Sequence, residues 1–223
     1  MITPTLKLKN LAPALLSLSC AFALLQPAPA QAHPHEFVTM EVTAKFDFDG
    51  NVSGLTYNWA FDEFFTAYAV DGQDQNKNGV AEQNELNALL DEILGNIQVI
   101  NYFTVFDKKA AVPKLAKAQP LAATLKERQL QLSFYVPFKA AVSLEKTPLR
   151  FSIYDDEFYI AMNFEPKSYG KIVPATIDNC TAGVDLADPD EDVMAFASSL
   201  GRDENSGGGL GASFAEWVTI KCN

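Results

Sequence analysis

The stretch "DQNKNGVAEQNE", residues 74–85, places oxygen-bearing side chains at alternating positions of a polar segment. These twelve residues fit the EF-hand calcium loop, which takes ligands from positions one, three, five, seven, nine and twelve and turns sharply at a glycine in position six. Gly79 occupies position six. The predicted Ca²⁺ ligands are Asp74, Asn76, Asn78, the backbone carbonyl of Val80, Glu82 and Glu85.

The loop has features that predict modest affinity. Ala81 replaces the branched aliphatic residue usual at position eight, and no second loop of this pattern occurs in the chain. Only Asp74 and Glu85 are expected as direct anionic ligands, because Asn76 and Asn78 are neutral. A solitary loop of this kind predicts a Kd of roughly 10⁻⁵ to 10⁻³ M and a structural role for calcium. The alternative is a polar turn that binds no ion.

A second candidate site lies at "HPHEF", which holds the only two histidines of the sequence, His33 and His35. If a leader is cleaved after Ala32, the α-amine and imidazole of His33 can together chelate Ni²⁺, Co²⁺, Cu²⁺ or Zn²⁺. His35 lies two residues further on, so an extended chain turns both rings to the same side. Pro34 lacks the amide proton that an amino-terminal X-X-His copper site requires. The alternative is a chance pair of histidines on a mobile terminus.

The sequence offers less support for catalysis or for dinucleotide binding. With both histidines near one terminus, the body of the chain cannot supply a Ser-His-Asp or Cys-His arrangement. Asp155, Asp156 and Glu157 could pair as in a glycoside hydrolase, but adjacent strand residues point to opposite faces. "GGGLGA" follows a charged loop rather than a strand, which argues against dinucleotide binding. We therefore expect a binding protein and not an enzyme.

Residues 1–32 have the features of a cleaved signal peptide: two lysines, an apolar run over 11–25 and a small-x-small site ending at Ala32. The alternative is a retained N-terminal anchor. Cleavage removes Lys7 and Lys9, leaving 15 basic against 28 acidic side chains, a net charge of −13. This charge argues against nucleic acid or anionic membranes as partners. No other apolar run is long enough to span a bilayer, so we expect a periplasmic protein without membrane insertion.

The two cysteines that follow the leader, Cys180 and Cys222, are an even pair in an exported chain. Such a pair predicts one disulfide, which would tie the C-terminal strand to the body of the protein. The competing interpretation is a thiolate metal site, which usually shows a CxxC spacing that is absent from this sequence.

Periodicity predicts the elements that position these sites. Apolar alternation indicates strands at 36–48, 52–61, 102–106, 128–138, 149–164 with a bend at 155–156, 171–180 and 214–222. Three- and four-residue spacing indicates helices beginning at Asp62 and covering 86–100 and 188–200, while 107–126 has no clear pattern and 201–213 resembles a flexible loop.

The predicted fold class is α+β, with mainly antiparallel strands and one EF-hand-like helix-loop-helix inserted at 62–100. We expect a single compact domain over 33–223, built either as one unit or as two lobes of about 33–165 and 166–223.

Several segments, in this order, resemble one known family: "AHPHEFV", "NWAFDEFF", "DQNKNGVAEQNEL", "YFTVF", "FSIYDDEFYIAMNF" and "FAEWVTIKC". The sequence resembles the domain of unknown function 1007 family, described as the periplasmic component of an uncharacterised ABC-type transport system. By motif match, His33 and His35 correspond to the family's N-terminal histidines, and residues 74–85 to its acidic loop.

The resemblance implies a periplasmic accessory protein linked to nickel, cobalt or zinc transport, with an inner-membrane transporter or permease as partner. The alternative is a calcium-stabilised structural adaptor that docks on a membrane partner and binds no transition metal.

Overall fold

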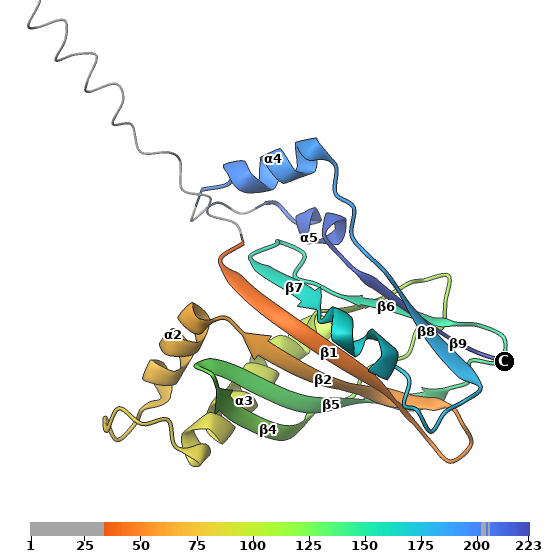
Figure 1. The fold of residues 1–223 in the computed structure, drawn as a ribbon, viewed down its shortest axis with the longest axis horizontal. Coiled ribbons are helices and arrows are strands. Elements are labelled where there is room, and N and C mark those ends of the chain that lie inside the picture. The colour runs from red at the N-terminus through yellow and green to blue at the C-terminus, as the bar shows by residue number, and fades with distance from the viewer. Residues whose placement is uncertain (1–33, 202–203, 205) are drawn as a thin grey trace, which may run out of the picture. The chain divides into compact units, whose positions relative to one another are not determined.

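Alternation of apolar and polar side chains builds a five-stranded sheet, sheet A. The computed structural model describes residues 34–201, 204 and 206–223. Sheet A has the strand order β4-β5-β2-β1-β7 (Figure 1), and its neighbours pair antiparallel except β1 and β7, which are parallel. Its strands are β1 (Glu36–Phe46), β2 (Val52–Phe61), β4 (Gln119–Lys126), β5 (Gln129–Val142) and β7 (Ile160–Phe164).

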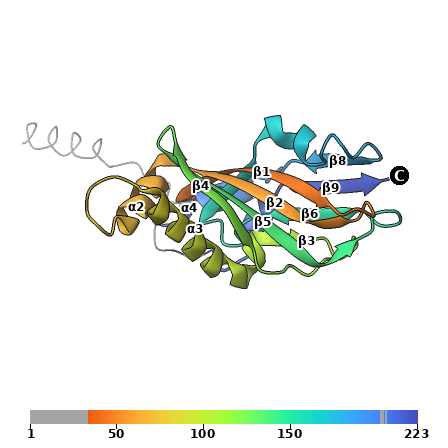
Figure 2. The ribbon, with the colours of Figure 1, turned by 90° about the horizontal axis from the view of Figure 1, so that it is seen from below.

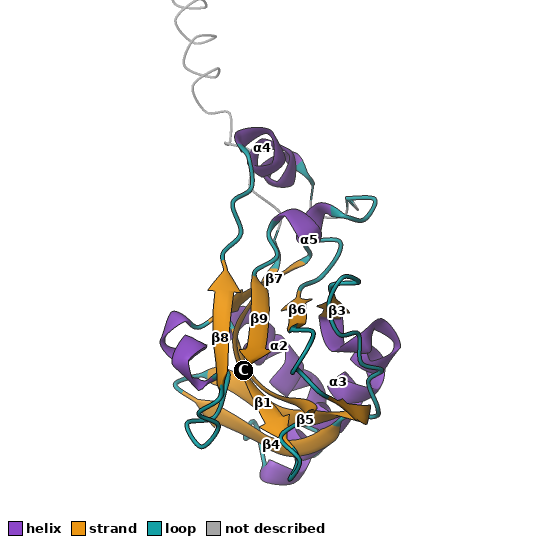
Figure 3. Cartoon of the chain, turned by 90° about the vertical axis from the view of Figure 1, so that its right-hand side faces the viewer, coloured by secondary structure: helices purple, strands orange, loops and turns teal. Residues whose placement is uncertain are grey.

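A second sheet, sheet B, contains four antiparallel strands in the order β3-β6-β9-β8, which Figure 3 shows side by side. The C-terminal strand β9 is therefore an interior strand, paired with β6 on one side and β8 on the other. The strands of sheet B are β3 (Thr104–Phe106), β6 (Leu149–Ile153), β8 (Cys180–Asp185) and β9 (Trp217–Cys222).

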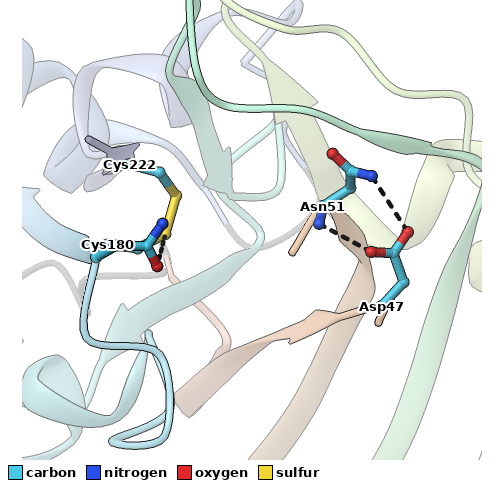
Figure 4. Close-up of a disulfide and its surroundings, with 5 residues drawn as sticks. Asp47, Asn51, Cys180 and Cys222 are labelled. Carbon is cyan, nitrogen blue, oxygen red and sulfur yellow. Dashed lines mark hydrogen bonds between the residues drawn. A yellow bond between two sulfur atoms is a disulfide. The ribbon is translucent and has the colours of Figure 1, made fainter. Parts of the chain in front are cut away.

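The predicted disulfide is confirmed. Cys180 and Cys222 face each other in the β8–β9 ladder and are joined by a disulfide (Figure 4). The bond closes a segment with a sequence separation of 42 residues and holds the last strand in sheet B.

In the described residues, α-helices interrupt the strands at two places, and a 3₁₀ helix lies between β7 and β8. The pair α2 and α3 follows β2 and lies together at one end of sheet A (Figure 2), and the short helices α4 and α5 lie between β8 and β9 in the sequence. The helical segments are α2 (Glu63–Gln73), α3 (Gln83–Ile97), the 3₁₀ helices η1 (Gln98–Phe103) and η2 (Pro166–Lys171), α4 (Glu191–Ser199) and α5 (Leu210–Ser213).

One hydrophobic core joins the inner face of sheet A, the leucine-rich face of α3 and the inner face of sheet B. Its centre is aromatic: Phe134 stacks on Tyr57 with ring centroids 4.9 Å apart and meets Trp59 edge-on at 5.0 Å. The buried Tyr57 hydroxyl lies 2.9 Å from Thr104 Oγ1, which satisfies its hydrogen-bonding capacity. These contacts connect the first sheet to the start of the second.

The predicted fold class, α+β with mainly antiparallel strands and few helices, is confirmed. The predicted single bent strand over 149–164 is wrong, because β6 and β7 belong to different sheets. Asp155 causes the separation: its Oδ2 accepts hydrogen bonds from the backbone N–H groups of Tyr159 and Ile160, and these bonds fold the chain into a turn.

Three boundaries also differ from the sequence interpretation. The 107–126 segment, which has no clear pattern, contains the edge strand β4. The strand expected over 171–180 begins only at Cys180, because η2 and a run of turns occupy the preceding residues. The 201–213 loop ends in α5. In each case tertiary pairing or short-range turn bonds decide the conformation where side-chain periodicity is weak.

We predict that the double variant Cys180→Ala/Cys222→Ala loses stability without losing its fold. The disulfide restricts the unfolded chain over a sequence separation of 42 residues, and the chain-entropy model assigns such a link about 4 kcal/mol. Urea unfolding monitored by tryptophan fluorescence measures the loss. The reduced wild-type protein is the control and should match the variant; equal stability of oxidised and reduced wild type would contradict the prediction.

Candidate functional site

The 74–85 loop turns sharply at its sixth residue, with its side-chain oxygens bonded to its own backbone. Gly79 adopts φ +74°, a conformation that favours glycine. Asp74 accepts hydrogen bonds from the N–H of Asn78 at 3.1 Å and from the N–H of Gly79 at 2.8 Å. Asn76 Oδ1 accepts from Asn78 N, and Asn78 Oδ1 accepts from Val80 N. The alternating oxygens therefore converge on the backbone of the turn.

Glu85 closes the loop from the start of α3. Its side chain is only 5% exposed. Oε1 accepts a hydrogen bond from Gln75 N and Oε2 accepts one from Glu82 N, each at 3.1 Å. The second of these bonds belongs to a capping box, in which Glu82 and Glu85 each bond the other's backbone. Glu85, the last residue of the loop, is thus bonded to the backbone at loop positions two and nine.

Neighbouring elements hold the two ends of the loop. Asp62 caps α2 by accepting from Phe64 N and Phe65 N. A side-chain bond from Gln73 Nε2 to Glu92 Oε2, 2.7 Å long, joins the end of α2 to α3. Gln83 Nε2 donates to the carbonyl of Ala123, which anchors the start of α3 on strand β4. The loop is therefore mounted on a helix pair that is itself bonded to sheet A.

The donor chemistry of the loop fits a hard divalent cation and not a soft one. Its candidate donors are carboxylate, amide and backbone carbonyl oxygens, the ligand types of Ca²⁺ and Mg²⁺. In residues 34–201, 204 and 206–223, no three His, Cys, Asp or Glu side chains are grouped so that they could hold a metal ion. A cation in this loop would therefore depend on the oxygens of Asn76, Asn78 and Val80 as well as on carboxylates.

One contact competes with such binding. Glu82 accepts hydrogen bonds from the side-chain amides of Asn76 at 3.0 Å and Asn78 at 3.1 Å. The amide Oδ1 atoms point instead to backbone N–H groups. Calcium could use Glu82 directly only if these amide bonds break, so the geometry favours a Glu82 that acts through a bridging water, as is common at position nine.

The second predicted site is described only in part. His33 lies outside the described residues, as does the predicted signal peptide, residues 1–32. The His35 ring packs on the Tyr159 ring with centroids 4.5 Å apart, and His35 N donates to the Tyr159 carbonyl at 2.8 Å. These contacts fix the start of β1 against the turn that precedes β7.

Glu36, the residue after this histidine, is one of three carboxylates that influence one another. Burial raises the pKa of Glu36 above its ordinary value of 4.5, and the negative charges of Asp62 and Asp155 raise it further. Asp62 also accepts a hydrogen bond from Phe37 N at 2.9 Å. The sequence predicts Asp62 as a helix cap, but its bond to β1 depends on tertiary structure. The amino-terminal end of β1 is thus a region of concentrated negative charge.

Asp155, an alternative catalytic candidate, has a structural role in the turn. Its carboxylate accepts from the backbone N–H groups of Glu157, Tyr159 and Ile160 at 3.3, 2.8 and 3.1 Å.

An antiparallel α+β fold with one helix-loop-helix segment inserted after its second strand defines the class of this protein. The chain belongs to the family described as "Protein of unknown function (DUF1007)", whose model matches residues 18–222. The family resemblance inferred from sequence segments is therefore confirmed.

An uncharacterized protein of Haemophilus influenzae is similar to this chain, with 28% identity over 211 residues, which cover 93% of this chain and 97% of the relative. No solved structure matches the chain. None of the helices in the described ranges has the length and apolar character required to cross a bilayer.

We predict that Glu36→Gln stabilises the protein at neutral pH. Because folding raises the pKa of Glu36, the folded state favours the protonated carboxyl, and this contribution is full below pH 4.5 and is lost as pH rises through the folded value. Glutamine mimics the protonated form, so the variant should be more stable than wild type at pH 7 and equally stable below pH 4.5. Urea unfolding at several pH values measures the difference.

The matched control is Glu145→Gln, an exposed change in the loop between β5 and β6, which should not raise the stability at pH 7. A Glu36→Gln variant that is less stable than wild type at pH 7 would show that the charged form of Glu36 is favoured.

Proposed function

We propose that this protein is an exported, periplasmic calcium-binding protein that acts as an accessory component of a metal transport system. Ca²⁺ would be held by the loop Asp74–Glu85, and a transition metal would be bound by His33 and His35 at the mature amino terminus. The transport role rests on the family resemblance. The calcium role rests on the loop itself.

The observation that carries the calcium proposal is the position of Glu85. Its side chain is buried and turned back toward Gln75 and Glu82, within the loop, instead of toward solvent. A glutamate at position twelve of an EF-hand supplies both carboxylate oxygens to Ca²⁺. A loop whose closing carboxylate is already in place needs less rearrangement on binding, which favours affinity.

Calcium would stabilise the fold through this loop. A ligand that binds only the folded state adds about 2.7 kcal/mol of stability at a concentration one hundred times its Kd. We predict that the Tm of the wild type rises with Ca²⁺, and that Asp74→Ala and Glu85→Gln abolish most of this rise because each removes an anionic ligand. Differential scanning calorimetry measures the rise in Tm at Ca²⁺ concentrations of about 0 to 10 mM, which reach the expected Kd range and exceed it. Mg²⁺ serves as the comparison ion.

The matched control is Asp91→Asn, which removes one carboxylate from the exposed face of the same helix α3 outside the loop. It should keep the full calcium response. A Tm in the wild type that does not change with Ca²⁺, or an Asp74→Ala variant with an undiminished response, would contradict the proposal.

The transition-metal proposal has separate support in the surroundings of His35. The ring is held against Tyr159, and the carboxylates of Glu36, Asp62 and Asp155 lie near the same end of β1. This negative charge favours a cation at the terminus. A cleaved amino terminus at His33 would add its α-amine and imidazole to the same region.

We predict that His33→Ala/His35→Ala weakens Ni²⁺, Cu²⁺ or Zn²⁺ binding at least about tenfold, since it removes two nitrogen ligands. Isothermal titration calorimetry measures this on protein whose amino terminus is established as His33 by intact mass. The calcium response is the internal control and should not change. Equal transition-metal affinity in the double variant would favour the other hypothesis, a calcium-stabilised adaptor that docks on a membrane partner.

A further inference from the structure

The outer face of sheet A carries a groove of about 510 Å³, on the side of the sheet opposite the hydrophobic core. The strands β4, β5, β2 and β1 lie side by side across it (Figure 1). Strand register places two complete cross-strand rows on its floor. The first row is Ala122, Ser133, Asn58 and Glu41. The second row is Thr124, Gln131, Ala60 and Thr39.

The polar side chains of this floor are available to a ligand. Asn58, Gln131 and Ser133 are half-buried, and within the described residues their side chains form no hydrogen bond with the protein. One row further along the same face, Thr56 lies opposite Tyr135 and its Oγ1 is buried without a partner in the described part of the chain. Half-buried amides and hydroxyls that the fold leaves unused can bond a polar ligand at little cost of desolvation.

The charges of the groove are separated by sign. Lys126 lies on β4 at one side, whereas Glu41 lies on β1 at the other. Glu165, the residue directly after β7, adds a second carboxylate on the Glu41 side. Its backbone N–H donates to the carbonyl of Met40 in β1. Lys126 and Glu41 form no ion pair within the described ranges, and the side chains between them are uncharged. Three strand intervals, about 14 Å, separate β4 from β1.

This arrangement selects a ligand class. Sites for apolar small molecules are lined mainly by hydrophobic and aromatic side chains, whereas this floor is largely hydroxyl and amide, and the Trp59 ring packs into the core instead. A ligand with a carboxylate at one end and an ammonium at the other would meet Lys126 and the two glutamates. An extended tripeptide spans about 10 Å, which the side chains can bridge across the sheet.

We propose that this groove binds a short linear peptide with free termini, its carboxylate at Lys126, its ammonium at Glu41 and Glu165, and its backbone amides on Asn58, Gln131 and Ser133. The site is independent of calcium and of the histidines, because none of its lining residues belongs to the 74–85 loop or to the amino-terminal segment.

The test is a titration of the ¹⁵N-labelled protein with triglycine, followed by amide chemical shifts. The expected result is a saturable shift confined to the groove strands, around residues 58–60, 122–126 and 131–133. N-acetyl-triglycine lacks the ammonium and triglycinamide lacks the carboxylate, so each should bind about tenfold more weakly, the loss expected for one charge-assisted contact.

Variants assign the two ends of the ligand. Lys126→Met should remove the difference between triglycine and triglycinamide, and Glu41→Gln should reduce the difference between triglycine and N-acetyl-triglycine. Lys146→Met, an exposed change outside the groove, is the matched control and should behave as wild type. Three results in the wild type would overturn the proposal: shifts that do not saturate, shifts that lie outside these strands, or equal shifts with maltose. The wild-type spectra decide this even if a variant fails to fold.

Discussion

The carboxylate of Asp62 joins the parts of this molecule on which both candidate metal sites depend. One of its oxygens caps α2 through Phe64 N and Phe65 N, and the other accepts the N–H of Phe37 in β1. The residue directly follows β2, so one side chain at the end of that strand is bonded to both the first turn of α2 and the beginning of β1. Charge-assisted bonds of this type are the stronger hydrogen bonds in proteins. The direction in which α2 leaves the sheet, and so the position of the 74–85 loop, depends on this junction.

The same junction concentrates negative charge. Burial raises the pKa of Glu36 most, and the charges of Asp62 and Asp155 raise it further at the start of the first strand. A fold does not gain stability by placing carboxylates together, because like charges and burial both disfavour ionisation. Such an arrangement is typical of sites where function sets the local chemistry.

Features that depend on neighbouring residues in the sequence could be predicted, and features that depend on pairing between distant strands could not. The alternation in 36–46, the leucine spacing of α3 and the cap at Asp62 are local patterns with direct physical causes. The calcium loop over 74–85 stays a prediction. The separation of β6 from β7 was not predicted because Asp155 makes the turn by bonding backbone N–H groups. Such bonds leave no pattern in the side-chain sequence. Strand β4 was not predicted because Ala123 is its one buried residue and the rest of the strand is exposed, which leaves no apolar alternation in the sequence. The groove on sheet A could not be found in the sequence at all, since its rows are assembled from four strands whose register is known only once they pair.

The parallel pairing of β1 with β7 has a consequence for the timing of folding. Glu36 pairs with Ile160, so the amino-terminal strand acquires its second neighbour from a segment more than half the chain away. Contacts of such long range form late, because the entropy of closing a large loop is lost before the strand pairing can compensate. On a chain that emerges amino terminus first, β1 must stay incompletely paired until residues 160–164 appear. The hairpin of β1 with β2 depends on near contacts and can form early, so the edge of β1 that faces β7 is the part of sheet A completed last.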